Sequence, residues 1–382
     1  MEVGERIVGG RTVEIDRRGE VRTFRPTDVD PAAIAGLEVA TGRWGATTVA
    51  EVLERHEARS LVVLHGDELA YEWYRPGDDG RRRNRCYSVT KSFTGTLAAI
   101  AMHDGVLDRA AAVGSLVPEL AATGFGDATV GQIADMTASI AYDEDYADAV
   151  ETTDGQTILG FGDYMVALGL ELPDADLPAD MPRSIRAFLA QVRKGSLPHG
   201  EVFAYATPTA EVLGWLLERA RGVAYAELLG ASLWSRIGAE HAASLSLDPA
   251  GAPMTGAGLA MTTRDLARFG LLLSEQSRPT NDPVIPSAVI ETIRDGGDQA
   301  AFQRGGHYAY LAGYSYRDQW WMPGGAGRPL SAWGIHGQVL WVDPDAQIVV
   351  ATHCGGPDPS GERRDLEQDA MCRALTAALT GR

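Results

Sequence analysis

The chain of 382 residues contains few cysteines and no long apolar run. Its three cysteines, Cys86, Cys354 and Cys372, are odd in number and far apart, and no C-x-x-C pair occurs. This pattern excludes a disulfide framework and a cysteine-rich zinc module, so we expect buried thiols. No apolar stretch reaches the roughly 18 residues that a membrane helix needs. The amino terminus is charged throughout and lacks the apolar segment of a signal peptide, so we expect a cytoplasmic protein.

The sequence is also poor in lysine and in positive charge. It carries 52 Asp and Glu against 34 Lys and Arg, for a net charge of −18. A chain this acidic repels nucleic acids and anionic lipids unless it gathers a local basic face. We therefore expect a small-molecule partner, with no nucleic acid and no membrane, and a homodimer stays open. Lys91 and Lys194 are its two lysines. Because arginine cannot act as a base near neutrality, a lysine kept against this bias can mark a position that needs a titratable amine.

Metal-binding patterns are absent from the sequence as well. The eight histidines show no H-E-x-x-H or comparable ligand spacing. We therefore expect no metal and no cofactor. Hydrophobic residues make up 45% of the chain and charged residues 23%, which are ordinary values for a globular protein of one large domain or two.

Apolar patterning predicts strands near both ends of the chain and helices between them. We expect a capped helix at 48–59, a hairpin of 60–65 and 68–74, helices at 88–104, 209–221, 263–273 and 364–380, and strands within 308–321, 340–343 and 348–352. Residues 1–45 look irregular. The predicted arrangement is an α/β (α+β) fold, with one sheet built from both termini and covered by helices. We place this sheet domain at 1–105 and 236–382, and an inserted, mostly helical domain at 106–235.

Ser88 and Lys91 form the pair of residues that carries chemistry most directly. They are three apart at the start of a predicted helix, so their side chains share a face. A hydroxyl becomes a nucleophile only when a base takes its proton, and a desolvated lysine can titrate near neutrality and act as that base. The start of a helix also favours a developing oxyanion. A serine nucleophile with a lysine base is therefore coherent here, although a surface serine near a surface lysine would show the same spacing.

The segment Cys86–Phe93 resembles the active-site helix of the serine β-lactamase and penicillin-binding-protein superfamily, with its S-x-x-K motif. Within that superfamily it is most similar to the class C branch, which includes esterases, carboxypeptidases and the 6-aminohexanoate-dimer hydrolases. Further stretches resemble this branch in the same order along the chain: Val117–Leu120, Thr129–Met136, Tyr142–Tyr146, Phe203–Thr207, Val212–Trp215, Thr263–Gly270, Gln319–Trp321 and Gly334–Gln338. The resemblance spans residues 60–380 and implies a β-lactamase-like fold, an antiparallel sheet flanked by helices with an inserted helical domain and the active site between them.

The resemblance also implies roles for individual catalytic residues. Ser88 matches the nucleophile that forms the acyl-enzyme, and Lys91 matches its paired base. Tyr205 matches a second general acid and base that passes the proton to the leaving group. The backbone amides of Ser88 and Ile335 would form the oxyanion hole.

Five further residues would contact the substrate by the same resemblance. Tyr146 would hydrogen-bond the leaving amine, as the matching tyrosine does in 6-aminohexanoate-dimer hydrolases, and Trp321 would wall the pocket. Thr207, His336 and Gly337 complete the set.

Some positions depart from the family pattern. Thr207 stands where the second motif commonly has asparagine, and His336–Gly337 replaces the Lys-Thr-Gly of true β-lactamases, which argues against an efficient β-lactamase. Gly256 stands where 6-aminohexanoate-dimer hydrolases can carry a polar residue that tunes the substrate. The carboxylates crowded into 143–154, Asp145 and Asp148 among them, suggest selection of a cationic amine on the substrate, or else a solvated acidic face.

Taken together, these features predict a serine hydrolase that cleaves an amide or ester bond through a Ser88 acyl-enzyme. The amide would be of the amino-acid type, as in an oligoamide, and the ester a carboxylic ester. A transacylase that passes the same acyl group to an amine is the first alternative. A catalytically silent ligand-binding protein on the same fold is the second.

Overall fold

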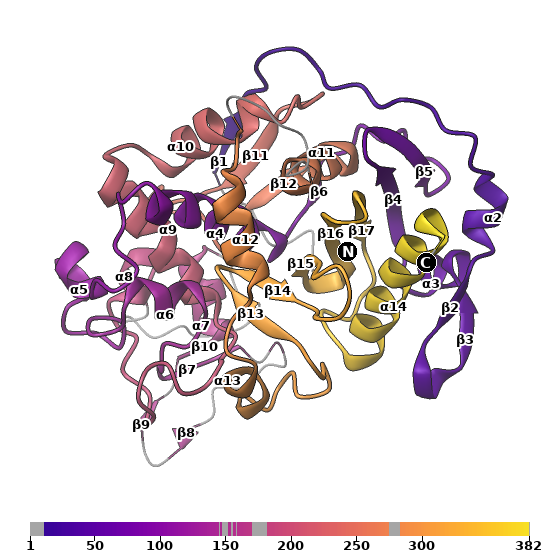
Figure 1. Cartoon of the computed structure of the whole chain (residues 1–382). Coiled ribbons are helices and arrows are strands. Elements are labelled where there is room, and N and C mark those ends of the chain that lie inside the picture. The colour runs from indigo at the N-terminus through magenta and orange to yellow at the C-terminus, as the bar shows by residue number, and fades with distance from the viewer. Residues whose placement is uncertain are drawn as a thin grey trace.

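The structure is a computed structural model that describes residues 11–144, 146, 152–153, 156–157, 159–169, 182–274 and 283–381. Its centre is a seven-stranded antiparallel sheet of order β13-β14-β15-β16-β17-β4-β5 (Figure 1). The strands are β13 (Ser315–Arg317), β14 (Trp320–Met322), β15 (Leu330–Gly334), β16 (Gln338–Asp343), β17 (Ile348–Cys354), β4 (Ala58–His65) and β5 (Glu68–Tyr74). The prediction of one sheet built from both ends of the chain is confirmed, because β4 pairs with β17.

Strand β4 contributes to two hydrophobic cores, one on each face of the sheet. Val62 and Leu64 pack in the core that contains helices α4 (Val89–His103) and α11 (Thr263–Ser274). Leu61 and Val63 point the other way, into the core beneath α3 (Val49–Arg55) and α14 (Glu362–Thr380). Successive side chains of a strand alternate between faces, and both faces are covered here. The strand therefore shows an unbroken apolar run instead of an apolar–polar alternation.

A second, smaller sheet lies beside the start of α4. Its order is β1-β11-β12-β6, formed by Thr12–Ile15, Ala243–Ser246, Leu259–Met261 and Asn84–Arg85. The expectation that residues 1–45 are irregular is wrong at β1, at α2 (Pro31–Ala35), at β2 (Glu38–Ala40) and at the 3-10 turn Gly42–Trp44. Strand β3 (Ala46–Thr48) follows directly after this segment and pairs with β2. Strand β1 pairs with residues more than two hundred positions away, so its local sequence carries little signal. From β1 the chain passes over the top of the molecule to α2 (Figure 1).

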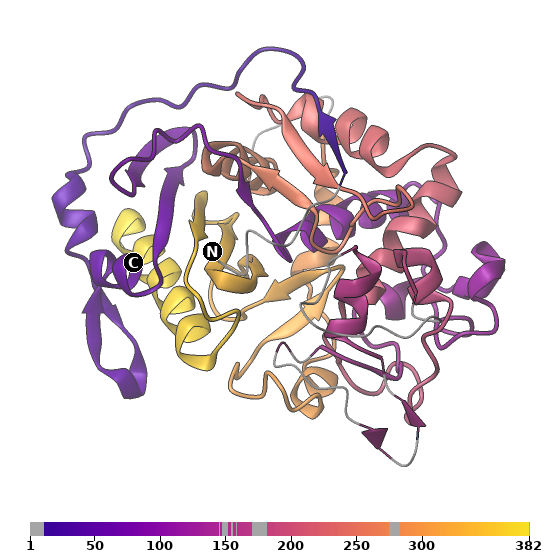
Figure 2. The ribbon, with the colours of Figure 1, turned by 180° about the vertical axis from the view of Figure 1, so that it is seen from behind.

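The region between residues 106 and 235 contains helices joined by long loops and lies to one side of the large sheet (Figures 1 and 2). Its helices are α5 (Val113–Leu116), α6 (Val130–Ala134), α7 (Phe161–Ala167), α8 (Ile185–Leu189), α9 (Thr207–Arg221) and α10 (Tyr225–Ser232), with short strands β7 (Tyr142–Asp143), β8 (Thr152–Thr153), β9 (Gln156–Thr157) and β10 (Leu159–Gly160). Single 3-10 turns cover Gly42–Trp44, Pro118–Leu120, Trp234–Arg236 and Ile335–Gly337, and helices α12 (Ser287–Arg294) and α13 (Gln299–Arg304) precede β13. One continuous core joins Phe125 and Leu213 of this region to Leu266 and Leu340 of the sheet side. The domain boundaries at 105 and 236 stay a prediction.

Most predicted elements are present, with shifted ends. The capping box at Thr48 opens α3, and Ser88 is the residue before the first turn of α4. The strand predicted within 308–321 is wrong for its first half, which forms turns, and strand β15 was not predicted. The three cysteines are buried and free, as expected. Among the described residues, no helix is both long and apolar enough to cross a membrane.

Candidate active site

Ser88 lies at the amino-terminal end of α4, where a tight backbone arrangement holds it. Tyr87, directly before it, has a φ of +45°, a conformation that side-chain-bearing residues seldom adopt. The carboxyl end of β15 passes close by, because a Cβ on Gly334 would lie only 2.5 Å from the Cys86 carbonyl oxygen. A glycine at 334 therefore lets the strand bring Ile335 up to Ser88. Ser88 itself is 8% exposed.

Lys91 is buried directly behind Ser88, with an exposed fraction of 1%. Its Nζ donates hydrogen bonds to Ser88 Oγ at 2.7 Å, to Thr207 Oγ1 at 3.0 Å and to the Gly256 carbonyl oxygen at 3.0 Å. The neighbouring side chains predicted from the S-x-x-K spacing are thus in contact. Burial lowers the pKa of Lys91 to about 8, while the carboxylates of Glu144 and Glu211 act in the opposite direction. An amine with this pKa is partly neutral near neutrality and can accept a proton.

Glu144 extends the polar chain beyond Thr207. The Thr207 backbone N–H donates to Glu144 Oε2 at 2.7 Å, and the Thr207 hydroxyl donates to the same carboxylate. Thr207 is the first residue of α9, so the carboxylate lies at the positive end of that helix. The residues Ser88, Lys91, Thr207 and Glu144 form one hydrogen-bonded series. Sequence reasoning did not single out Glu144, although the motif Tyr142–Tyr146 contains it.

Glu211 holds the loop that provides the third partner of Lys91. Its buried carboxylate accepts hydrogen bonds from Tyr164 Oη at 2.6 Å, from the Thr255 amide at 2.8 Å and from the Gly256 amide at 3.0 Å. Burial raises the pKa of Glu211, and these donors oppose the rise. A Cβ at Gly256 would lie 2.9 Å from Glu211 Oε1 and 2.9 Å from Thr207 Cγ2. A side chain at position 256 would therefore require Glu211 or Thr207 to shift.

The acidic segment 143–154 is described only in part. Asp145 and Asp148, which the sequence suggested as selectors of an amine, lie outside the described residues. Asp143 is exposed, and Glu144 faces Thr207 rather than solvent. Glu211 was also missed, because a single glutamate within an apolar helix gives no sign of which loop its carboxylate will hold.

Tyr205 forms the opposite wall of the site and belongs to an aromatic cluster. Its ring stacks on Trp321 with centroids 5.4 Å apart, and Lys91 Nζ lies 5.1 Å from the Tyr205 centroid. Trp321 also stacks on Trp333 at 5.1 Å and meets Tyr308 edge-on at 4.9 Å. Burial raises the pKa of Tyr205 well above its usual range, and hydrogen bonding with Ser88 opposes this. The phenol therefore keeps its proton near neutrality and can act as a donor.

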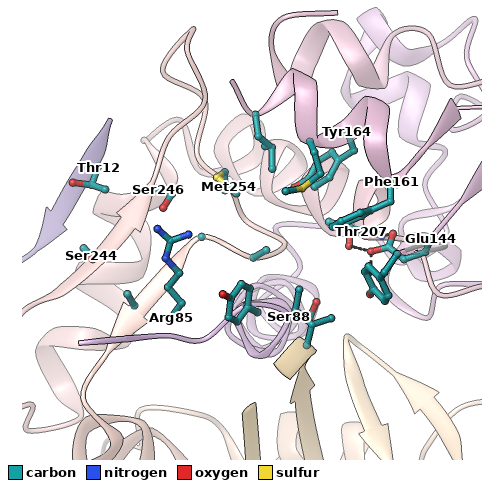
Figure 3. A pocket seen from close by; sticks show the side chains of 18 residues that line it. Thr12, Arg85, Ser88, Glu144, Phe161, Tyr164, Thr207, Ser244, Ser246 and Met254 are labelled. Carbon is teal, nitrogen blue, oxygen red and sulfur yellow. Dashed lines mark hydrogen bonds between the residues drawn. The ribbon is translucent and has the colours of Figure 1, made fainter. Parts of the chain in front are cut away.

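Two cavities meet at Ser88. The larger has a volume of about 190 Å³ (Figure 3), and the smaller, lined by aromatic residues, has about 30 Å³. Ser88, Tyr146 and Ile335 line both cavities. A substrate attached at Ser88 could therefore extend in two directions, as the two sides of a cleaved bond require.

The remaining predicted substrate residues fall around these cavities with one exception. Thr207 lines the larger cavity, and Trp321 and Gly337 line the smaller. His336 lines neither: its backbone has a φ of +63°, and its Nδ1 lies 2.8 Å from the Gly356 carbonyl oxygen. The catalytic and binding roles of all these residues stay predictions. No cluster of three or more potential metal ligands occurs in the described part of the chain.

Comparison with known proteins supports the fold. A family model described as Beta-lactamase matches residues 46–371. The 6-aminohexanoate-dimer hydrolase of Paenarthrobacter ureafaciens is 33% identical over 328 residues, which are 86% of this chain and 80% of that protein. The family match spans the large sheet, the helical region and every motif named above.

Solved structures also support a β-lactamase-like fold. A Bacillus anthracis protein provisionally assigned as a 6-aminohexanoate-dimer hydrolase superposes with a TM-score of 0.82 at 25% identity, over 97% of this chain and 91% of that chain. A family VIII carboxylesterase superposes with a TM-score of 0.60 at 16% identity, over 85% of this chain and 95% of that chain, and so shares the fold. The predicted β-lactamase-like architecture is confirmed.

Proposed function

Because this chain belongs to the β-lactamase family of serine hydrolases, we propose that it cleaves an amide or carboxylic ester through an acyl-enzyme on Ser88. One observation carries the proposal: the buried Lys91 Nζ lies 2.7 Å from Ser88 Oγ. Burial also keeps the pKa of this amine at about 8, so that it can be neutral near physiological pH. A binding protein without catalysis has no need of a desolvated lysine, which is costly to keep in the fold.

Acylation begins with Ser88. Its Oγ attacks the substrate carbonyl carbon while the neutral Lys91 amine takes the hydroxyl proton. Negative charge then moves onto the carbonyl oxygen, and the amides of Ser88 and Ile335 are the proposed donors to it. The start of α4 adds its partial positive charge to the same place.

Collapse of the tetrahedral intermediate needs a proton on a leaving nitrogen or on a basic leaving oxygen. Tyr205 is the proposed donor, because the raised pKa of its phenol keeps it protonated. As the bond from carbonyl carbon to leaving group breaks, the phenol gives up its proton and recovers one from the Lys91 ammonium nearby. Lys91 is then neutral again, and a water activated by the same pair attacks the ester and releases the acid.

The bond cleaved is an amide of the amino-acid type in our proposal. Support comes from the relative at 33% identity, which is named for hydrolysis of the 6-aminohexanoate dimer. Tyr146 lines both cavities at Ser88 and so lies where a leaving amine would pass. Carboxylic esters are the alternative substrates, since an ester needs less help from Tyr146 to leave.

Stopped-flow turnover of p-nitrophenyl acetate and butyrate tests the proposal. Wild type should release a burst of about one equivalent of nitrophenol, as expected of an acyl-enzyme that forms faster than it hydrolyses. Ser88→Ala should abolish the burst, whereas Ser115→Ala, which removes an exposed hydroxyl on α5, should keep it. Equal and slow release from wild type and Ser88→Ala would overturn the proposal. Product analysis with an added amine would separate hydrolysis from acyl transfer.

A further inference from the structure

The stacked rings of Tyr205 and Trp321 come from segments far apart in the chain. Tyr205 lies just before α9 and Trp321 lies in β14, yet their ring planes are only 23° apart, with centroids at 5.4 Å. A general acid works only when its proton points at the atom that leaves. Contacts that join the two segments outside the cavities therefore affect how well the Tyr205 hydroxyl is placed.

Arg109 makes such a connection. Its Nη2 donates to Asp135 Oδ2 at 2.6 Å, and its Nη1 donates to Asp318 Oδ1 at 2.6 Å. Asp135 follows α6 in the helical region, and Asp318 lies in the turn between β13 and β14, at the edge of the large sheet that borders this region (Figure 1). The Asp318 side chain is fully buried, whereas that of Arg109 is 30% exposed. One guanidinium thus ties the helical region to the sheet through two charge-assisted hydrogen bonds.

The first connected segment leads from Asp135 to Tyr205. Met136, the residue after Asp135, has a φ of +52°. Its carbonyl oxygen accepts a hydrogen bond from the Ala204 amide at 2.9 Å, and Ala204 directly precedes Tyr205. A shift of Asp135 would therefore pass through Met136 to the backbone of Tyr205.

The second connected segment leads from Asp318 to Trp321. Asp318 and Gln319 have φ values of +47° and +63°, so two successive residues adopt a conformation that needs contacts to hold it. The Asp318 amide donates to Asp135 Oδ1 at 3.0 Å, and the Ser92 hydroxyl of α4 donates to the Gln319 carbonyl oxygen at 2.8 Å. Trp321 comes two residues after this turn, so its ring direction depends on the turn.

Arg317 is the second cation of this cluster and is held less closely. Its Nη1 lies 3.3 Å from Asp135 Oδ2, and its Nε lies 3.4 Å from Asp318 Oδ2. Burial raises the pKa of Asp318, and Arg109 is the charge that opposes this rise most strongly. Without Arg109, two neighbouring carboxylates would share one cation, and the loss of a partner from a buried pair is costly. The turn would then lose its main support.

We propose that Arg109 is a positioning residue, which joins Asp135 to Asp318 and so holds Tyr205 against Trp321 in the orientation that protonates the leaving group. This inference rests on the proposed function, in which Tyr205 is the acid. Arg109 itself lines neither cavity at Ser88. A substrate whose leaving group needs a proton should therefore depend on Arg109, and one whose leaving group departs as a stable anion should not.

Ethyl butyrate and p-nitrophenyl butyrate test this dependence, because they share an acyl group and differ in the basicity of the leaving oxygen. In Arg109→Gln, kcat/KM for ethyl butyrate should fall about 10- to 100-fold, as misplacement of a reacting group by a distant change can cost. Turnover of p-nitrophenyl butyrate should change little, and its burst should persist. A general loss of structure lowers both rates by the same factor, so the ratio of the two is the measurement.

Arg328→Gln is the matched control. Arg328 also donates to two carboxylates, Glu291 at 2.8 Å and Asp295 at 3.1 Å, but its side chain is 48% exposed. Its loss should leave the ratio unchanged. Arg109→Lys is the second variant, in case glutamine prevents folding. Lysine keeps the charge and lacks the planar fork that reaches both carboxylates, so the ratio should fall only partway.

A double-mutant cycle with Tyr205→Phe identifies the residue through which Arg109 acts. Adding Arg109→Gln to Tyr205→Phe should cause no further loss with ethyl butyrate, because the acid that Arg109 positions is already absent. A structural role elsewhere would instead give the same loss in both backgrounds.

The outcomes separate this inference from the proposed function. Equal losses for the two esters, or independent losses in the cycle, overturn the positioning role and leave the Ser88 burst intact. A wild type that hydrolyses p-nitrophenyl butyrate but not ethyl butyrate has no acid for Arg109 to position, which also overturns it. Absence of the burst from wild type is a different result, which overturns the proposed function and this inference with it.

Discussion

The two lysines of this chain lie in opposite surroundings. Lys91 is 1% exposed and donates to two hydroxyls and a carbonyl, with no carboxylate among its hydrogen-bond acceptors. The side chain of Lys194 is 45% exposed and forms an ion pair with Asp127, whose own side chain is 65% exposed. Desolvation without a paired carboxylate lowers the pKa of Lys91 to about 8. At the other site, the hydrogen bond from Lys194 is the main reason that the pKa of Asp127 falls to about 2.

The difference shows how its surroundings change the readiness of a lysine to release its proton. The fold excludes water from Lys91 and surrounds its Nζ with uncharged hydrogen-bond acceptors. The ammonium form is therefore only weakly stabilised. Lys194 stays in contact with water and has Asp127 as its counter-ion. Exchanging lysine for arginine should therefore reduce turnover at position 91 and leave turnover unchanged at position 194.

The largest effect is expected from the pair Lys91→Arg and Lys194→Arg. An arginine at 91 stays protonated and cannot take the Ser88 proton, so kcat/KM for p-nitrophenyl butyrate should fall by about 10²–10⁴-fold. Arginine at 194 keeps the charge beside Asp127 and should leave turnover unchanged. Steady-state kinetics on both variants make this measurement.

Thermal unfolding shows whether Lys91→Arg is folded, so that a loss of structure is not taken for the loss of a base. A larger side chain at a buried position can disturb packing, so Lys91→Met serves as a second variant of similar length. Activity retained in a folded Lys91→Arg protein would contradict the role of Lys91 as base.

Tyr205→Phe should have the next largest effect. Phenylalanine keeps the stack on Trp321, so the wall of the site should persist. Loss of the phenol should reduce turnover of an amide by about 10²–10³-fold, because an amine leaves only when protonated. A p-nitrophenyl ester, whose leaving group needs no proton, should lose less. Equal losses for amide and ester would argue against Tyr205 as the acid.

Glu144→Gln should change the pH dependence more than the maximum rate. Wild-type kcat/KM should rise as pH increases through about 8, where Lys91 loses its proton. The Glu144 carboxylate raises the pKa of Lys91, so removing its charge should move this rise to lower pH. Glutamine can still accept a hydrogen bond from Thr207, which keeps the local structure comparable. A profile that stays in place, or moves to higher pH, would contradict the proposed coupling.

The smallest effect is expected at the exposed ion pair of Lys194 and Asp127. Asp127→Asn should change the free energy of unfolding at pH 7 by less than about 1 kcal/mol, because exposed ion pairs contribute little. The lowered pKa of Asp127 means that its contribution is present above its unfolded pKa and is lost as pH falls toward 2. The difference in stability between wild type and variant should therefore be smaller at pH 2, where Asp127 is only partly ionised, than at pH 7. Chemical denaturation at the two pH values checks this.

Much of the fold and the central pair could be predicted from the sequence. The strands β4 and β17 appear as apolar runs, and the capping residues around Thr48 appear as a fixed spacing, because both signals are local. S-x-x-K places two side chains on one helix face, which is also a local rule. The scarcity of lysine was a less selective signal for the site, since it pointed to Lys194 as well as to Lys91.

The remainder depends on contacts between distant residues. Glu144 reaches Thr207 across 63 positions, and Glu211 reaches Gly256 across 45. The pairing of Thr12 with Ser246, which both line the larger cavity, is longer still. Spacing along the chain does not reveal these tertiary contacts, because the fold decides which distant residues come together.

The pairing of β4 with β17 affects how the protein folds during synthesis. Thr352 donates its hydroxyl to the Ser60 carbonyl oxygen, 292 residues away. During synthesis, β4 and α4 leave the ribosome long before the strands and the last helix that cover them. Contacts of such separation form slowly and leave apolar strand edges exposed in the meantime. Truncation before β17 should therefore give an insoluble chain, and a chaperone that shields β4 should raise the yield of folded protein.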